Sequence, residues 1–152
     1  MKTSLITIVI ALTTLLSSSV EAASCNSLPQ VNKPTLKLVK TYEEHTVDLQ
    51  KDLKEARACI VDSLSSKVTL NANQYGALVS WAYSIGCDEV KTSDLIDRLN
   101  KHREPINKVA EQELPKWSEH GELAVADPVT RRNDEVRLFN TDSFDVALPC
   151  KK

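Results

Sequence analysis

Residues 70–87, LNANQYGALVSWAYSIGC, constrain the fold of this chain more than any other stretch. Asn71 and Gln74 stand three positions apart, which is the spacing of a capping box at the start of a helix. Gly86 follows the last apolar position and is suited to a backbone of positive φ at the helix end. The apolar positions recur at helical spacing, and they are Leu78, Val79, Trp81, Ala82 and Ile85. The pattern predicts a central helix, close-packed on more than one side.

The first 22 residues are typical of a secretory signal peptide. The positive charge at its start comes from Lys2, and its short apolar core is LITIVIALTTLL. The small residues that a signal peptidase recognises are provided by Val20-Glu21-Ala22. The apolar run is too short for a membrane span. We therefore expect a secreted, extracellular protein that is a monomer and has no membrane partner, with its mature chain beginning near residue 23.

The net charge of −2 argues against nucleic acid as a partner and against a strongly basic surface. Removal of residues 1–22 deletes one Lys and one Glu, so the balance does not change. A local basic patch remains possible at Arg131, Arg132 and Arg137.

Four cysteines, all outside the signal peptide, suggest two disulfides in an exported chain. Three pairings are possible. We favour Cys59–Cys87, which would join two helices that are adjacent in sequence, and Cys25–Cys150, which would tie the chain ends together. Zinc is the alternative, but the chain has no CxxC and no paired His at ligand spacing. We expect neither a metal nor a cofactor.

The rest of the chain predicts a mainly α domain over residues 35–150, after a loop at 23–34. No strand pattern and no internal repeat is present. A charged face that includes Arg57 is expected to be solvated on the long helix. Helices are expected at 35–44, 48–65 and 94–100. A further helix is expected to begin at Pro105 and to be broken at Pro115. The last helix is expected to begin at Asp127-Pro128 and to bury Val129, Val136 and Phe139.

Several runs together resemble the phage-type lysozymes, glycoside hydrolase family 24, and most closely their secreted fungal branch. The runs are LVKTYEE (38–44), DLKEARACI (52–60), LNANQYGALVSWAYSIGC (70–87), SDLIDRLN, ELPKW and RRNDEV. The resemblance implies a helical lobe with a small β-hairpin lobe. It also implies antibacterial hydrolysis of cell-wall peptidoglycan, with inversion and without a cofactor.

The resemblance implies that Glu43 is the general acid, because LVKTYE stands where the family has a run like LVKSFE. Glu44 replaces the glycine that usually follows. In the family, an Asp nine residues later and a nearby Thr, both on the hairpin, position the attacking water. An inverting glycosidase needs two carboxyl groups far enough apart to admit that water.

The hairpin of the family has no counterpart in the sequence. Only four residues lie between Glu43 and Asp48, and no glycine precedes residue 76. Asp52 lies nine residues after Glu43, but it belongs to the run that matches the helix between the lobes, and Ala58 stands where the Thr should follow. We interpret this spacing as a coincidence and expect impaired activity.

Smaller departures concern residues near the expected groove. Ser84 stands where the family has Asn, and Arg131 with Arg132 match an arginine pair that we interpret as a packing and ion-pair feature. Tyr42 and Trp117 are candidate sugar-stacking aromatics, although core packing explains them more simply. The alternatives to a muramidase are a non-catalytic module that binds cell-wall glycan or protein, and a shortened, inactive product.

Overall fold

The computed structural model describes residues 25–43, 47–119 and 127–150. The expected signal peptide, Glu44 and His45 lie outside this part of the chain. The elements, in chain order, are α1 (Lys33–Tyr42), α2 (Leu49–Asp52), α3 (Lys54–Ser63), β1 (Leu70–Asn71), α4 (Ala72–Ile85), α5 (Cys87–Thr92), α6 (Asp94–Lys101), α7 (Ile106–Glu113), the 3-10 helix η1 (Leu114–Ser118), α8 (Pro128–Phe139) and β2 (Val146–Leu148). The fold is therefore mainly α, as the sequence predicts.

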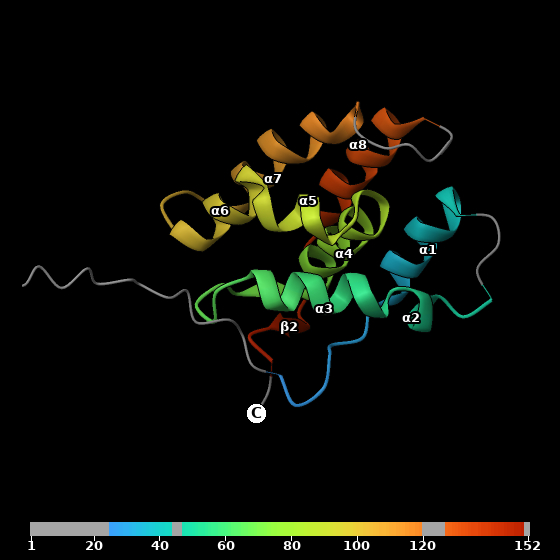
Figure 1. Ribbon diagram of the computed structural model, residues 1–152, viewed down its shortest axis with the longest axis horizontal. Helices are drawn as coiled ribbons and strands as arrows, with labels where there is room; N and C mark the ends of the chain where they lie inside the picture. Colours follow the sequence, from blue (N-terminus) through green and yellow to red (C-terminus); the bar gives the residue numbers. More distant parts are fainter. Residues whose placement is uncertain (1–24, 44–46, 120–126, 151–152) are drawn as a thin grey trace, which may run out of the picture.

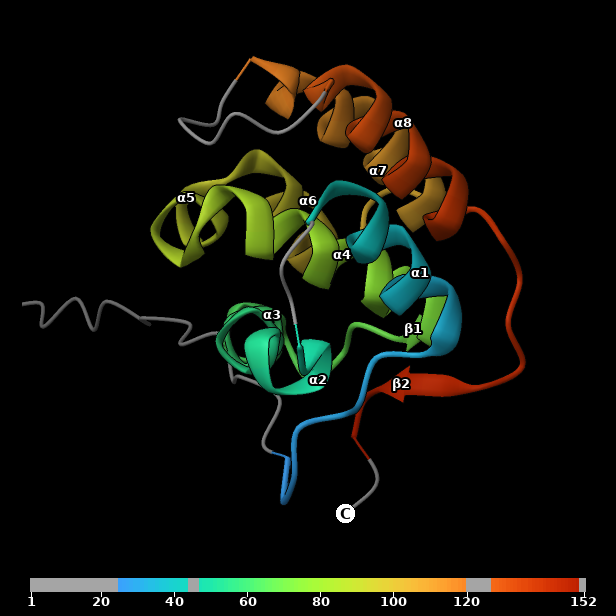
Figure 2. The same ribbon diagram turned by 90° about the vertical axis from the view of Figure 1, so that its right-hand side faces the viewer.

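Helix α4 lies at the centre, packed by α1, α3 and α8 (Figures 1 and 2). Its start has the predicted capping box: the Asn71 side chain accepts from the Gln74 N–H, and the Gln74 side chain accepts from the Asn71 N–H. Gly86 ends it with a positive φ of 89°. Trp81 is fully buried and meets Trp117 edge-on, with ring centroids 5.6 Å apart. The apolar sides of this helix are thus enclosed by its neighbours.

The approach of α1 to α4 is closest at Gly76. A Cβ on this residue would lie 2.9 Å from the Cβ of Thr35 and closer still to its hydroxyl oxygen. Thr35 itself is fully buried, and both its N–H and its hydroxyl donate to the Asn32 side chain. Only a glycine at position 76 lets the two helices pack at this distance.

Gly76→Ala is expected to destabilise the fold by about 1–2 kcal/mol. The gain in helix propensity is about 1 kcal/mol. Overpacking typically costs about 1–3 kcal/mol, and we expect the upper part of that range because the displaced Thr35 side chain is short and branched rather than flexible. Urea unfolding measures the change. The double variant Gly76→Ala/Thr35→Ala, compared with Thr35→Ala alone, should show a smaller loss. An undiminished loss in that background would mean that Thr35 is not the obstacle.

Several element boundaries differ from those expected. Helix α1 begins at Lys33 because the Asn32 side chain caps it, so the loop ends earlier than residue 34. The helix expected at 48–65 is interrupted at Leu53, and α5 was not expected at all. Arg57, predicted on a wet face, is buried because its guanidinium donates to the carbonyl oxygens of Pro29 and Gln50.

The C-terminal part also differs from expectation. Val129 is exposed, whereas Val136 is half-buried and Phe139 fully buried as predicted. The segment after α8 contains β2, which pairs antiparallel with β1 and places Leu148 opposite Leu70. Both strands are too short to leave an alternating pattern in the sequence.

The two ends of the described chain meet below this small sheet. Disulfides join Cys25 to Cys150 and Cys59 to Cys87, with Cα–Cα distances of 5.4 and 5.8 Å, and these are the pairs favoured from the sequence. Asn73 connects the same region: its amide donates to the carbonyls of Thr141 and Asp142, and its side-chain oxygen accepts from Asn32. The start of α1, the start of α4 and the segment after α8 are therefore fastened together.

Candidate functional site

Glu43 directly follows α1 and lies where that helix meets α8. Its N–H donates to the Val39 carbonyl at 3.0 Å, while its own backbone is already extended. The carboxylate accepts from Nη1 of Arg131 at 2.8 Å and keeps 22% of the side chain exposed. The candidate acid is thus held in place on one side and reaches solvent on the other.

Arg131 is the group that orients Glu43. Its side chain is only 1% exposed. Besides Glu43, the guanidinium contacts the Ser80 carbonyl at 3.2 Å and Oε1 of Glu135 at 3.3 Å. It also lies 5.4 Å from the centre of the Tyr42 ring, within cation–π range. These four contacts, with Tyr42 on α1, Glu43 directly after it, Ser80 on α4 and Glu135 on α8, fix the planar guanidinium in place.

A buried ionic cluster lies beneath this pair. Glu135 is fully buried and accepts from the Ser80 hydroxyl at 2.7 Å and from Arg132 at 3.1 Å. Arg132 also donates to the Ser84 hydroxyl at 2.7 Å. Burial raises the pKa of Glu135 against the opposing influence of the two arginines, and burial lowers the pKa of Arg132.

This cluster excludes the basic patch that the sequence left possible at Arg131 and Arg132. Arg131 and Arg132 form no basic surface patch, because both are buried and paired with Glu135. Arg137 is exposed but pairs with Asp134 at 2.5 Å. The interpretation of the arginine pair as a packing and ion-pair feature agrees with these contacts, and the Ser84 hydroxyl is one of its partners.

The two candidate stacking aromatics take part in packing. The Tyr42 hydroxyl donates to Asp134 at 2.7 Å, and one face of its ring meets Arg131. Burial, followed by the hydrogen bond to Asp134, raises the pKa of Tyr42. Trp117 lies partly buried against Trp81.

Sequence reasoning missed Tyr83, near the C-terminal end of α4. Burial raises the pKa of its phenol, and the negative charges of Glu43 and then Asp52 raise it further. Both carboxylates therefore act on the same tyrosine, although Asp52 is exposed and belongs to α2. A tyrosine among the apolar residues of the central helix was the signal that could have identified it.

The described residues contain no group of three or more His, Cys, Asp or Glu side chains arranged to hold a metal ion. None of the helices within that same part of the chain is both long and apolar enough to span a bilayer.

The comparison with protein families shows which family this mainly helical chain belongs to. The family model described as phage lysozyme matches residues 13–135, so the chain belongs to the phage lysozyme family. That match begins within the segment expected to be a signal peptide.

Two solved structures share the fold. The muramidase domain of SpmX from Asticaccaulis excentricus has a TM-score of 0.60 at 21% identity, covering 75% of this chain and 99% of that one. A point mutant of P22 lysozyme has a TM-score of 0.58 at 22% identity, covering 74% and 99%. An endolysin of Bacillus phage PZA is 34% identical over 91 residues, which are 59% of this chain and 34% of that protein. The chain spans about a third or less of the length of the curated relatives it matches.

Proposed function

We propose that this protein is secreted and acts on bacterial peptidoglycan, with Glu43 as the general acid and with weak hydrolysis. The observation that supports it is the pairing of a solvent-reaching Glu43 with the buried Arg131 at 2.8 Å. The endolysin and muramidase names of the relatives support the substrate class. The same proposal includes a signal peptide at residues 1–22 and membership of the secreted fungal branch of the phage-type lysozymes.

We expect the hydrolysis to be weak because the segment between Glu43 and α2 is short. Helix α1 ends at Tyr42 and α2 begins at Leu49, which leaves six residues for a lobe that should contain a hairpin. The strands of the described residues, β1 and β2, come much later in the chain. Without an Asp and a Thr to orient water, general-acid catalysis loses much of its contribution of about 10²–10⁴ and the positioning of the nucleophile as well.

Glu43→Gln is expected to reduce the clearing of a suspension of bacterial cell walls about tenfold or more, because an amide cannot protonate the leaving oxygen. The decrease in turbidity measures it, with Glu55→Gln, an exposed carboxylate at the start of α3, as the matched control. Equal clearing by wild type and Glu43→Gln would remove Glu43 as the acid.

Sedimentation with the same cell walls separates the alternatives. The first alternative is a non-catalytic module that binds cell-wall glycan or protein. Such a module would stay on the walls without clearing them, in wild type and variant alike. A shortened product would do neither, and sequencing the transcript would then show a longer form with a hairpin.

A further inference from the structure

The outer face of α1 has a strong local charge in a chain of net charge −2. Lys33, Lys37 and Lys40 are exposed and follow one another at intervals of four and three, so they share one side of the helix. No acidic residue occurs between Lys33 and Tyr42. The ion pairs among the described residues involve none of these three ammonium groups.

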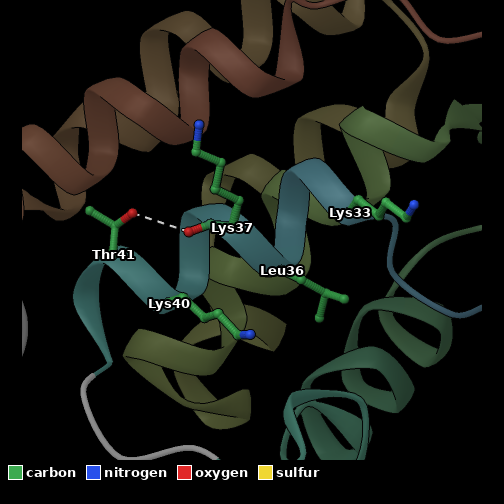
Figure 3. Close-up of a pocket in the computed structure, with 5 residues that line it drawn as sticks. All are labelled: Lys33, Leu36, Lys37, Lys40 and Thr41. Carbon is green, nitrogen blue, oxygen red and sulfur yellow. Dashed lines mark hydrogen bonds between the residues drawn. The ribbon is translucent and has the colours of Figure 1, made fainter.

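The same three lysines line an open hollow of about 460 Å³ together with Leu36 and Thr41. Leu36 is half-buried and contributes the apolar part of the lining. The Thr41 hydroxyl donates to the Lys37 carbonyl at 3.1 Å, so its hydrogen is already used within the helix (Figure 3). The polar groups left for a ligand are therefore cations.

The helix that presents these lysines is rigidly mounted. The opposite side of α1 is buried through Thr35 and Val39, and Thr35 fits against Gly76 of the central helix. Asn32 fixes the start of α1 to Asn73. Because the backbone is held, only the lysine side chains must be ordered when a ligand binds.

The arrangement of the lysines favours a chain over a single ion. Figure 3 shows the three ammonium groups pointing in different directions from the helix. Lys33 and Lys40 are seven residues apart, which corresponds to about 10 Å along a helix axis. One small anion cannot contact all three, whereas a linear polymer with repeated charges can.

A second hollow continues the first one towards α8. Lys37 and Thr41 line both hollows, and the second also contains Arg137 and Asn73. Asp134 lies there too, but it is paired with Arg137 and accepts from Tyr42. A polymer following α1 would thus meet the exposed guanidinium of Arg137 at the edge of α8, although one of its nitrogens already donates to Asp134.

We propose that this α1 face binds a linear polyol phosphate chain, the class of anionic polymer present in many bacterial envelopes. Lysine ammonium groups suit phosphates as compact point charges. The residues that line the hollow include no aromatic side chain, whereas single-stranded nucleic acid is held by base stacking on aromatic residues. The site is separate from Glu43, so it needs no hydrolytic activity.

The experiment is a binding titration of poly(glycerol phosphate) at a series of salt concentrations. The wild type is compared with the α1 variant Lys33→Gln/Lys37→Gln/Lys40→Gln. The control, Lys51→Gln/Lys54→Gln/Lys67→Gln, has the same net charge as the α1 variant. The three lysines replaced in the control are also exposed, and they too form no ion pair among the described residues. The α1 variant should bind at least about tenfold more weakly. Its plot of log affinity against log salt should be less steep by up to about 2–3, as expected for three lost phosphate contacts.

The other outcomes overturn the proposal. An equal loss in the control would mean that net charge alone drives binding. Competition by free glycerol phosphate at the same phosphate concentration would indicate a site for single anions, and tighter binding of single-stranded DNA would indicate a nucleic-acid surface. Glu43→Gln should bind the polymer as the wild type does, so failure of the muramidase proposal and failure of this one are distinguishable.

Discussion

Replacing Arg131 with methionine is expected to lower the free energy of unfolding by about 3–5 kcal/mol, because it removes one of the two arginines that neutralise the buried Glu135 carboxylate. The arginine is almost fully buried and bridges Glu43, Glu135 and the Ser80 carbonyl. Methionine has a similar length and packs adaptably, so little of the loss should come from a cavity. Urea unfolding with the disulfides intact measures the change.

The matched control for this variant is Arg137→Met on the same helix. Arg137 also pairs with a carboxylate, Asp134, but 76% of its side chain is exposed. Exposed pairs of this kind contribute about 0–1 kcal/mol. If both variants lost equal stability, burial of the Arg131 cluster would not be the cause. A small loss for Arg131→Met would show that Arg132 alone neutralises Glu135.

Removing the bridge between the chain ends is expected to cost a similar amount. Cys25 and Cys150 are 125 residues apart, and the second disulfide shortens the loop they close by 28. For a loop of about 100 residues the chain-entropy model gives about 4.7 kcal/mol, and measured values are often lower. Cys25→Ala/Cys150→Ala should therefore lose about 3–5 kcal/mol in urea unfolding, with Cys59–Cys87 still formed.

The control for the substitutions themselves compares this variant with the wild type under reducing conditions. Neither protein then has the Cys25–Cys150 bridge, so their free energies of unfolding should agree. A loss under oxidising conditions below about 1 kcal/mol would contradict the entropic argument. Non-covalent contacts of the N-terminal segment would then suffice. These include the hydrogen bonds from Arg57 and Tyr75 to the Pro29 carbonyl.

The sequence predicted those elements whose signals are local. The capping box at Asn71, the positive φ at Gly86 and the cap at Asp127 are each determined by a few neighbouring residues, and all three are present. The resemblance to phage lysozymes, carried by several runs in order, was confirmed at the level of the family by the match over residues 13–135. The position of Glu43 at the end of the first helix follows from the same runs.

What the sequence could not predict depends on contacts between distant segments. Arg57 looked solvated because its partners, such as the Pro29 carbonyl, lie in a loop without periodicity. The sequence left a basic patch possible at Arg131 and Arg132, because nothing local shows that Glu135 and Ser80 will be buried beside them. The charges acting on Tyr83 come from α2 and from the end of α1, so only the folded chain reveals them.

The closure of the chain ends also determines how the protein could be combined with other modules. Residues 25 and 150 are joined at one pole, and Figure 2 shows α7 and α8 at the opposite pole. A partner domain fused at either end would leave from the same point, away from those helices. Any such partner would therefore be attached to the lobe at a single point, on the side opposite to α7 and α8.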